Sequence, residues 1–534
     1  MDRRKRSVFL ILSGTLFIMV AWYFFINRSD ISDDTNLSTE ELEIREGQRL
    51  SVQYCSTCHL YPEPDILPKD TWISSVLPAM GPKMGIFRHE VRPYPTERDP
   101  YLPDGYYPAE PQLSRSEWQK IIDFYHEAAP EKLSEADRSP AIRIDSLFFD
   151  VKTTNYEPNS TPKVTASRIE SENGLIFIGD VNERKLLIFD RNLELIQSVE
   201  VDSPVSDIRV INKENETGQI DLLITLMGNL LPTDAPSGSI RKITYSVAEN
   251  EVISDSLIWD ELSRPVEVKP TDLNQNGLRD LVISEFGHRA GKLLWLNKLE
   301  DGSGYRQHVL LDSPGCIEAK VTDFTGNNRL DVVALCTQAD QAIYLFENQG
   351  GGKFLQKTLL QFHIAAGSSS FELHDFNNNG HPDILYTSGD NADYSTVFKP
   401  YHGVYIFLND GYNNFEEEWF YPVHGAFNAK AADFTQNGEL DVAVIGFYAD
   451  FENKPEEGFV IFKNEGGLNF TPYHHPEASN GRWITMDVAD WTGNGYHDIL
   501  LGNFSDGFFG ASDSTREVWS NSPHFLLLEN KSGR

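Results

Sequence analysis

From about residue 145 to the C-terminus, short apolar runs alternate with polar loops that are rich in Asp, Asn and Gly. Each polar loop is followed by an apolar run, as at residues 281–283 and 332–334, and then by a second run that ends in Asn, as at residues 293–297. Short, evenly spaced strands separated by turn residues are typical of β-sheets built from repeats. The pattern therefore predicts an all-β repeat array in this part of the chain.

Five of the loops align without gaps, and each ends in an aspartate. They recur about every 55 residues, the size of a four-stranded propeller blade. Two less regular copies precede them: residues 175–178 with 186–189, and residues 221–224 after a long loop at 207–221. Seven copies predict a seven-bladed propeller over residues 141–534. Residues 141–151 alternate like a strand, and we expect them to complete the last blade and remove its open edge.

The five loops carry oxygen-bearing side chains at positions 1, 3, 5 and 9. With a backbone carbonyl at position 7, this spacing lets nine residues surround one hard cation, and calcium suits it better than magnesium, which prefers a rigid octahedron. A single such loop could be an ordinary Asx turn, but five with a common closing aspartate favour up to five calcium sites. The candidate ligands are Asp272, Asn274, Asn276, Asp280, Asp323, Thr325, Asn327, Asp331, Asp375, Asn377, Asn379, Asp383, Asp433, Thr435, Asn437, Asp441, Asp490, Thr492, Asn494 and Asp498.

These loops resemble those of FG-GAP/VCBS repeats, the family of the integrin α-subunit propeller, and the resemblance extends from about residue 145 to the end of the chain. It implies a seven-bladed propeller with calcium between the inner two strands of a blade. The second loop has Asn328 at position 6, where glycine is expected, so we expect a left-handed Asn there.

The segment before the repeats has helical periodicity. Apolar residues recur at helical spacing over residues 41–54, a short helix is predicted at 71–77, and a further amphipathic helix begins at Ser114. Glu117 stands three residues after Ser114, which is the spacing of a capping box. A small all-α domain is therefore predicted at residues 42–130.

The first of these helices leads into Cys55-Ser56-Thr57-Cys58-His59, which reads CxxCH, the attachment signature of c-type haem. Two thiols one helical turn apart can each form a thioether, and the adjacent histidine can reach the iron. A redox CxxC and half of a zinc site are the alternatives. Neither a βαβ context nor a second Cys/His pair with zinc spacing accompanies the motif, so one covalent haem c is favoured.

The order of CxxCH, a methionine-bearing loop and a closing helix with a late aromatic residue resembles a class I cytochrome c over residues 45–130. The resemblance implies that His59 is the proximal ligand and that a methionine is the distal one. Met80 is preferred because Leu-Pro-Met-type turns present the sulfur from a fixed backbone. Met84 and then His89 remain alternatives, because the stretch between Met84 and Ser114 is longer than usual.

At the N-terminus, four basic residues at positions 3–6 precede an apolar run at 7–26 that is long enough to span a bilayer. We predict a single-pass signal anchor at residues 1–27 and a polar tether at 28–41, with a cleaved signal peptide as the alternative. The bulk of the chain is then extracytoplasmic, in the periplasm at a bacterial inner membrane, which is where c-type haem is normally attached. Cys316 and Cys336 could pair in that compartment, although the sequence leaves their pairing open.

The chain has 46 basic and 80 acidic residues, a net charge of −34. No basic stripe follows the first six residues, which excludes nucleic acid as an expected partner. The excess of acidic residues is compatible with bound cations or with a basic redox partner protein.

These features favour a membrane-anchored c-type cytochrome with a calcium-binding propeller, acting in one-electron transfer and partner docking. Two alternatives remain: the propeller is a catalytic unit (a dehydrogenase or a polysaccharide-acting enzyme) with the haem as electron outlet, or it is an adhesion or glycan-binding module. We also expect the propeller face opposite the aspartate loops to receive the cytochrome domain or an external partner, through aromatic residues such as Tyr401, Phe508 and Trp519 on long connections.

Overall fold

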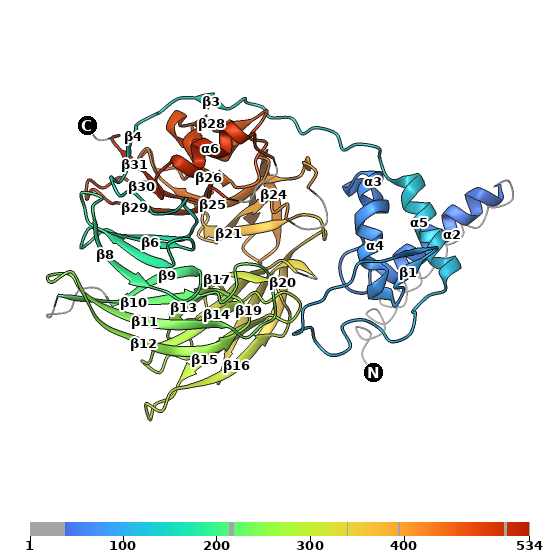
Figure 1. Cartoon of the computed structure of the whole chain (residues 1–534), viewed down its shortest axis with the longest axis horizontal. Helices are drawn as coiled ribbons and strands as arrows, with labels where there is room; N and C mark the ends of the chain where they lie inside the picture. The colour runs from blue at the N-terminus through green and yellow to red at the C-terminus, as the bar shows by residue number, and fades with distance from the viewer. Residues whose placement is uncertain (1–37, 213–217, 339, 393–395, 507–509, 533–534) are drawn as a thin grey trace, which may run out of the picture.

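The computed structural model describes residues 38–212, 218–338, 340–392, 396–506 and 510–532. They form a helical unit and a β-propeller joined by an extended segment (Figure 1). Within these residues no helix is long and apolar enough to cross a membrane. The predicted anchor and most of the predicted tether lie outside the described residues.

Seven sheets make up the propeller. From the axis outward, blade 1 contains β5 (Val164–Glu170), β6 (Leu175–Asp180), β7 (Lys185–Phe189) and β8 (Leu195–Glu200). Blade 2 contains β9 (Val205–Asn212), β10 (Gln219–Leu226), β11 (Gly238–Ser246) and β12 (Glu251–Leu262). Blade 3 contains β13 (Pro265–Thr271), β14 (Asp280–Glu285), β15 (Lys292–Lys298) and β16 (Tyr305–Leu311). Blade 4 contains β17 (Cys316–Thr322), β18 (Asp331–Cys336), β19 (Gln341–Gly350) and β20 (Lys353–Phe362).

The remaining blades follow the same order. Blade 5 contains β21 (Ser368–His374), β22 (Asp383–Ser388), β23 (Gly403–Asn409) and β24 (Phe415–Pro422). Blade 6 contains β25 (Ala426–Ala432), β26 (Asp441–Gly446), β27 (Phe459–Asn464) and β28 (Phe470–His474). Blade 7 contains β29 (Trp483–Ala489), β30 (Asp498–Asn503), β31 (Phe525–Asn530) and, from the start of the propeller, β4 (Phe149–Lys152). The predicted seven-bladed propeller is confirmed.

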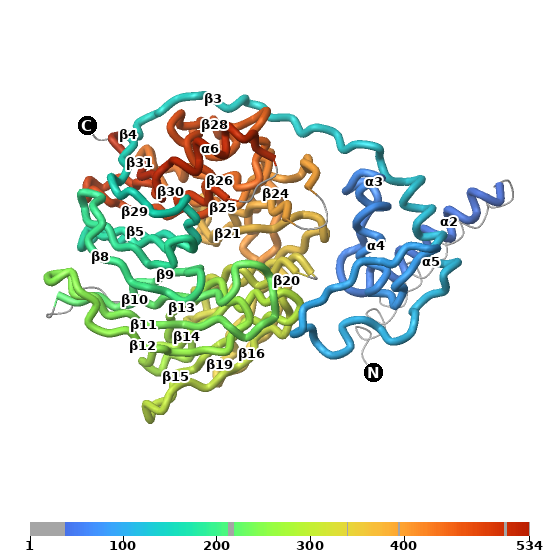
Figure 2. The backbone as a smooth tube through the Cα atoms, in the orientation of Figure 1, coloured from blue at the N-terminus to red at the C-terminus, as the bar shows by residue number. Residues whose placement is uncertain are grey.

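The segment at 141–151 contributes to two blades. β4 pairs antiparallel with β31 and completes blade 7, as expected. Its first part does not join that blade, because β3 (Arg143–Ile144) pairs in parallel with β28 at the outer edge of blade 6. Figure 2 shows the segment passing from the helical unit to these outer edges. β4 thus covers the edge of β31, and β3 covers the last two residues of the β28 edge.

The second strand of every blade reads as a continuous apolar run because neighbouring blades cover it on both faces. β14, β18, β22, β26 and β30 are buried at every position. The fourth strand β20, by contrast, is buried at none of its positions. Cys316 and Cys336 are directly opposite each other in β17 and β18 and form a disulfide, which settles the question that the sequence left open.

The helical unit contains α2 (Thr39–Cys55), η2 (Pro64–Ile66), a continuous helical run made of α3 (Lys69–Thr71), η3 (Trp72–Val76) and α4 (Leu77–Met80), then η4 (Pro82–Met84), β1 (Arg88–His89), β2 (Arg92–Pro93) and α5 (Arg115–Ala128). Ser38 and Glu41 form a capping box at the start of α2, and Ser114 and Glu117 form the predicted one at the start of α5. The helices enclose one apolar core that includes Trp72, Trp118 and Tyr125.

Helices α2 and α5 cross at Gly47. A Cβ atom at this position would lie 2.1 Å from the carbonyl oxygen of Lys120 and 2.9 Å from the Cβ of Phe124. The close approach therefore requires glycine, because any side chain would push the helices apart.

We expect Gly47→Val to destabilise the helical unit by about 1–3 kcal/mol or more, through overpacking at this crossing. Gln48→Ala, at the next and exposed position of α2, is the control. Thermal melting of the whole chain followed by its helical circular dichroism measures the effect. An unchanged helical transition in Gly47→Val would contradict the described crossing.

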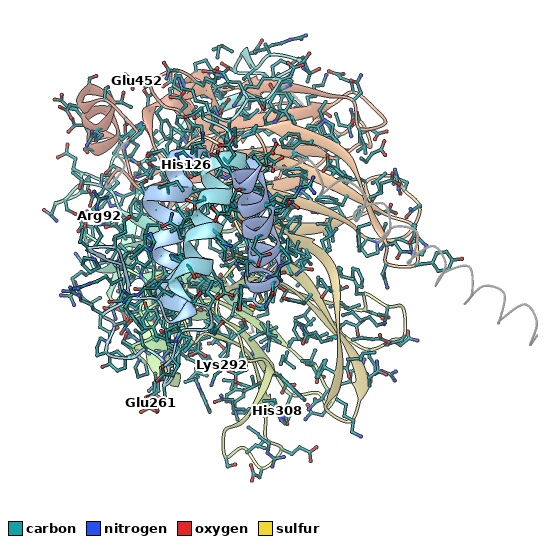
Figure 3. All side chains as sticks on the ribbon, turned by 90° about the vertical axis from the view of Figure 1, so that its right-hand side faces the viewer. Arg92, His126, Glu261, Lys292, His308 and Glu452 are labelled. Atoms are coloured by element: carbon teal, nitrogen blue, oxygen red, sulfur yellow. A yellow bond between two sulfur atoms is a disulfide. The ribbon has the colours of Figure 1, made fainter. Side chains whose placement is uncertain are left out.

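The helical unit lies against one face of the propeller, in front of the blades in Figure 3. We call this face, which carries the connections between second and third strands, the docking face. The opposite face carries the five aspartate loops, and we call it the loop face. On the docking face, Asp99 accepts hydrogen bonds from the Thr233 hydroxyl at 2.7 Å and the Asp234 N–H at 3.1 Å. The helical unit therefore lies on the face that was predicted to receive it.

Candidate functional site

Each aspartate loop connects the first and second strands of its blade and folds around its opening aspartate. In the loop at 490–498, the Asp490 carboxylate accepts the N–H groups of Asn494 at 3.1 Å and Gly495 at 2.9 Å. Asp272, Asp323, Asp375 and Asp433 accept the corresponding pairs. The side-chain oxygen at position 5 accepts the N–H of position 7, as Asn494 does from Tyr496. The five loops thus share one backbone conformation.

Two positions of every loop have a left-handed backbone. At position 6 these are the expected glycines and, in the second loop, Asn328 with φ of 61°, as predicted. Position 4 is also left-handed, and it holds Gln275, Asn378 and Gln436 in three loops. The prediction missed this second position, although Gly326 and Gly493 at position 4 of the other two loops were a signal for it.

The closing aspartates are buried and tie the loop to the third strand. Asp498 accepts the Asn530 N–H at 2.7 Å with one oxygen and the Trp491 N–H at 2.8 Å with the other. Asp331, Asp383 and Asp441 likewise accept the N–H of the asparagine near or at the end of the third strand, which is Asn348, Asn409 or Asn464. These asparagines are structural partners of the loops, and sequence reasoning noted them only as turn residues.

The loop at 272–280 differs from the other four. The Asp280 carboxylate accepts the Trp295 Nε1–H at 3.0 Å, the Asn297 side-chain amide at 3.1 Å and the Lys298 N–H at 2.7 Å. Its second oxygen is therefore directed to a tryptophan instead of to the backbone of its own loop. A cation at this loop would compete with two side-chain donors from the third strand, those of Trp295 and Asn297.

The paired carboxylates within a loop repel each other. Burial raises the pKa of Asp441 and Asp498 to about 6, and it also raises the pKa of Asp383. Backbone hydrogen bonds to these carboxylates oppose the rise, and the charge of the opening aspartate adds to it. A bound cation would remove this repulsion and stabilise both carboxylates.

The donor set of the loops fits calcium. Each loop supplies two carboxylates with amide or hydroxyl oxygens between them, and hard cations of this size take oxygen ligands from flexible loops. In the described part of the chain, no three His, Cys, Asp or Glu side chains lie together as a metal-binding group. Calcium binding in these loops would thus depend on Asn and Thr oxygens as much as on carboxylates.

The CxxCH motif follows directly from α2. Cys55 is the last residue of the helix, Cys58 is exposed three residues later, and both thiols are free. Burial, with a smaller effect of Cys58, raises the pKa of the Cys55 thiol to about 12. The His59 Nδ1 atom lies 2.7 Å from the carbonyl oxygen of Leu60. Because a carbonyl only accepts, Nδ1 carries the proton, and the lone pair is left on Nε2, as in histidines that bind metal.

The residues considered for the distal position lie in the same unit. Met80 ends α4 and Met84 ends η4, and both are partly buried against the core of the helical unit. His89 lies in β1, its ring stacked on Tyr94 with ring centroids 6.2 Å apart. The residues fit a haem: two free thiols one turn apart, a histidine with an available Nε2, and thioether side chains nearby in an apolar core.

Of the aromatic residues on the long connections, Tyr401 contacts the helical unit as predicted, whereas Trp519 does not. Tyr401 donates a hydrogen bond to the Ile66 carbonyl at 2.8 Å, and Arg289 pairs with Glu97 at 2.6 Å. Trp519 does not serve as an anchor: it lies in α6 (Asp513–Asn521), is 1% exposed and packs against Phe451 with ring centroids 4.7 Å apart. The prediction for Trp519 was wrong because the connection folds its aromatic residues into a small core of its own. Phe508 lies outside the described residues.

A partly buried histidine lies beside the Tyr401 contact. The ring of His363 is 4.5 Å from that of Tyr401. Burial first, and then the charge of Lys399, lower the pKa of His363 from 6.5 to about 4. Because the unfolded chain binds this proton at a higher pH than the folded chain, stability is complete above pH 6.5 and falls as the pH drops to about 4.

Between pH 6.5 and about pH 4, we expect this histidine to lower the free energy of unfolding by up to about 3 kcal/mol. His363→Gln should remove this part of the pH dependence of stability. His126→Gln, at an exposed position of α5, is the control. Melting temperatures between pH 7 and about pH 4 measure the effect. Identical slopes for the wild type and His363→Gln would contradict it.

One of three comparisons with known proteins, the comparison with protein families, agrees with the propeller. Residues 323–386, from the second aspartate loop into β22, match the FG-GAP-like repeat family. A comparison with curated proteins gives no match. Among solved structures, the crystal structure of the Saccharomyces cerevisiae Sqt1 aligns with a TM-score of 0.42 and 10% sequence identity, covering 71% of this chain and 98% of that chain. The chain therefore contains an FG-GAP-like repeat within a seven-bladed β-propeller.

Proposed function

We propose that this protein is a membrane-anchored, extracytoplasmic c-type cytochrome that transfers single electrons, with its propeller serving as a calcium-stabilised docking scaffold. The observation that carries the proposal is the geometry at Cys55, Cys58 and His59. Two free thiols stand at the end of a capped helix, and the next residue is a histidine whose Nδ1 donates to a carbonyl. A haem bound there would supply a one-electron couple, with a potential tuned by its axial ligands and by burial.

The chain's own residues would orient and shield such a group. The Leu60 carbonyl holds the ring of His59 in one tautomer, and α2 is held in place by the crossing with α5. The apolar core of the helical unit, which Met80 and Met84 border, would help to shield such a group from water. A drier surrounding favours the less charged oxidation state and raises the potential.

The propeller supports this role by holding the helical unit in one orientation. Asp99, Glu97 and Ile66 of the helical unit bond to three different connections of the docking face. The excess of acidic residues, with 80 against 46 basic ones, would attract a basic redox partner over a distance. The calcium proposed for the five loops would stabilise the scaffold and take no part in electron transfer.

The distal ligand can be assigned by substitution. We expect Met80→Leu to lower the reduction potential by on the order of 100 mV and to remove the sulfur-to-iron absorption band, because a weak thioether ligand favours ferrous iron. Met84→Leu, in the same core, is the matched control and should leave both unchanged. If Met84→Leu lowers the potential and removes the band while Met80→Leu does not, Met84 is the distal ligand. No change in either variant would exclude methionine as the distal ligand.

The function itself is tested by an anaerobic redox titration of the full chain, produced by a host that attaches c-type haem. One electron taken up per chain, reversibly and with the spectrum of a low-spin haem, is expected. A chain that carries haem but undergoes no reversible reduction would contradict the electron-transfer role.

A further inference from the structure

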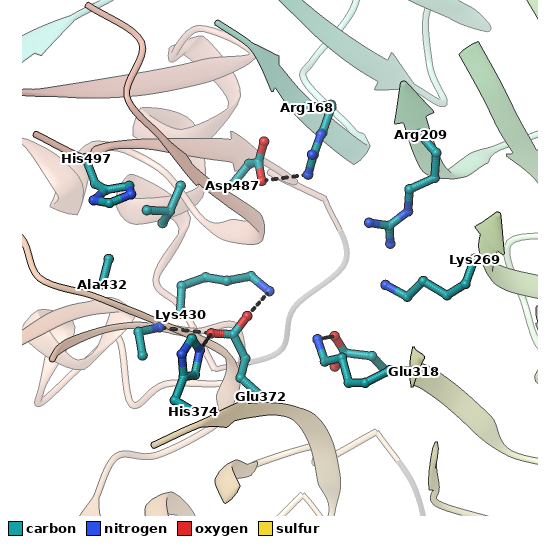
Figure 4. Close-up of a pocket in the computed structure, with 13 residues that line it drawn as sticks. Arg168, Arg209, Lys269, Glu318, Glu372, His374, Lys430, Ala432, Asp487 and His497 are labelled. Carbon is teal, nitrogen blue, oxygen red and sulfur yellow. Dashed lines mark hydrogen bonds and ion pairs between the residues drawn. The ribbon is translucent and has the colours of Figure 1, made fainter. Parts of the chain in front are cut away.

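The charged side chains at the axis of the propeller are paired with one another. Arg168 pairs with Asp487 at 3.2 Å, and Lys430 pairs with Glu372 at 2.9 Å (Figure 4). The remaining axial cations, Arg209, Lys269 and Lys320, are paired in the same way with Glu267 or Glu318. The axis therefore has no surplus of positive charge among the described residues, because its cations and carboxylates neutralise one another.

A separate cavity of about 530 Å³ lies on the loop face, between blades 3 and 4. Its walls come from the aspartate loop at 272–280, from the hairpin that joins β15 to β16, and from the hairpin that joins β19 to β20. Pockets of about 300–1,000 Å³ are the size that holds small organic molecules. Because this face is opposite the docking face, a ligand can reach the cavity without displacing the helical unit.

The cavity exists because one hairpin lacks a side chain. Gly352 stands four residues after Asn348, and Leu468 stands four residues after Asn464, the equivalent asparagine of blade 6. Both residues have a left-handed backbone, with φ of 76° and 61°. Leu468 packs against the apolar core shared by blades 5 and 6, whereas a Cβ atom at Gly352 would lie 3.6 Å from the ring of Trp295. The glycine therefore leaves open a space that a leucine fills elsewhere in the propeller.

The aspartate loop at 272–280 offers this space a side-chain amide that later loops use internally. At position 5 of those loops, Asn379, Asn437 and Asn494 donate from the side-chain amide to the carbonyl of the third-strand asparagine, at 3.2, 3.0 and 3.0 Å. Lys298 replaces that asparagine in blade 3, and Asn276 makes no equivalent hydrogen bond within the described residues. The amide of Asn276 lines the cavity and can donate to a ligand.

Cations outnumber carboxylates in the lining. Lys298, Arg306 and Arg329 line the cavity, against Glu300 as the one lining carboxylate in the described chain. None of these three cations forms a salt bridge in the part of the chain that the structure describes. Lys298 lies over the ring of Tyr305, with its Nζ atom 4.5 Å from the ring centroid. Unlike the axis, this cavity has a surplus of positive charge.

Carboxylates just outside the cavity are engaged by other groups. Asp301 accepts the Ser303 N–H at 2.9 Å and its hydroxyl at 2.6 Å, and Glu347 pairs with Lys357 at 2.6 Å. These contacts are the main causes that lower the pKa of Asp301 and of Glu347, and the charge of a cavity arginine contributes least in both. The cavity arginines thus remain available to an anionic ligand.

One wall of the cavity is aromatic. The rings of Trp295 and His308 stack with centroids 4.5 Å apart, and Phe354 meets Trp295 edge-on at 5.7 Å. Burial first, and then the charge of Arg306, lower the pKa of His308, so its ring is neutral at pH 7. His308 and Phe354 are partly exposed at the cavity and present apolar ring surface to it.

We propose that this cavity binds an acidic saccharide, a sugar chain that carries uronate carboxylates. Arg306 and Arg329 would pair with a carboxylate, and Asn276 would donate to a hydroxyl oxygen. His308 and Phe354 would contact the C–H groups of a sugar ring. The hairpin tips around the cavity are exposed, so a polymer can pass along the loop face. This inference does not depend on the haem proposal, because the cavity belongs entirely to the propeller.

The test is isothermal titration of the full chain, in calcium-containing buffer of constant ionic strength, with β-1,4-linked triglucuronate and separately with trigalacturonate. Cellotriose, which has the rings of triglucuronate without the carboxylates, is the matched neutral probe. We expect saturable binding of one acidic trimer per chain, at least about tenfold tighter than cellotriose and weaker at higher ionic strength. Absence of saturable binding by both acidic trimers, or equal affinity for cellotriose, would overturn the proposal.

Two substitutions test the location. Gly352→Leu should fill the cavity, Arg306→Gln should remove a charged donor, and each should weaken binding by about tenfold or more. Leu468 shows that this type of hairpin accepts leucine at that position. Lys353→Gln, which removes an exposed cation beside Gly352 but outside the cavity, is the control and should leave binding unchanged. Melting curves show whether each variant folds, and either folded variant is sufficient. Wild-type affinity in a folded cavity variant, or equal loss in Lys353→Gln, would overturn the location.

Discussion

Cys58→Ser is expected to reduce covalent haem at least about tenfold, because only one thioether can then form. Cys58 is exposed and its thiol is free, so the substitution removes a reactive group without disturbing the core. The helical unit should keep its fold, which separates loss of attachment from loss of structure. Haem content per chain after denaturing electrophoresis measures the effect.

Ser56→Ala is the matched control for this experiment. Ser56 stands between the two cysteines, is exposed, and its hydroxyl donates only to the Val52 carbonyl of its own helix. We expect wild-type haem content in this variant. Full covalent haem in Cys58→Ser, or equal loss in both variants, would contradict attachment through the CxxCH motif.

Removal of calcium is expected to destabilise the propeller by on the order of 10 kcal/mol, because each of up to five independent sites contributes about 2.7 kcal/mol when calcium is a hundredfold above its dissociation constant. The unfolded chain lacks the two left-handed positions and the burial that bring the carboxylates together. Melting in calcium and in excess chelator measures the difference. An unchanged melting temperature in chelator would contradict calcium binding in these loops.

Single substitutions then identify the sites. Asp490→Asn should remove about one site's share of the calcium-dependent stabilisation. Asp410→Asn is the control, since Asp410 also accepts N–H groups in an exposed turn but belongs to none of the five loops. Asp272→Asn should cost less than Asp490→Asn, because the closing Asp280 of its loop is already engaged by Trp295. Equal calcium responses in Asp490→Asn and Asp410→Asn would contradict the assignment.

The fold was predictable where a local pattern repeats. The second strands are buried on both faces, so they appear in the sequence as short apolar runs after each loop, and their number gave the number of blades. The capping box at Ser114 is likewise a local signal, and α5 begins where that signal places it.

Features that depend on distant parts of the chain were harder to predict. Asp207 was placed in a loop, whereas it belongs to β9 near the axis, where its carboxylate accepts the Val268 N–H of the next blade at 3.1 Å. The pairing of β3 with blade 6 was not predicted, because a two-residue strand has no periodicity that the sequence could show. The ion pair of Arg209 with Glu267 could not be found from sequence, since the two residues lie on the inner strands of different blades and meet only when the propeller closes.

The candidate sites divide in the same way. The five loops and the CxxCH motif are contiguous, so their residue types and spacing were sufficient to select them. The contacts on the docking face join residues as far apart as Ile66 and Tyr401. The aromatic residues of the long connections included Tyr401, which makes such a contact, but also Trp519, which is buried, and the sequence did not distinguish the two. Aromatic residues on a long connection can either pack into a local core or contact a partner.

The central claim is that one haem is covalently bound at Cys55 and Cys58 of the exported chain. Intact-mass spectrometry of the full chain after acid–acetone extraction tests it most directly, because extraction removes any haem that is not covalently attached. The account predicts the polypeptide mass plus one haem. A chain that has the mass of the polypeptide alone, from a host that attaches haem to other c-type cytochromes, would contradict it.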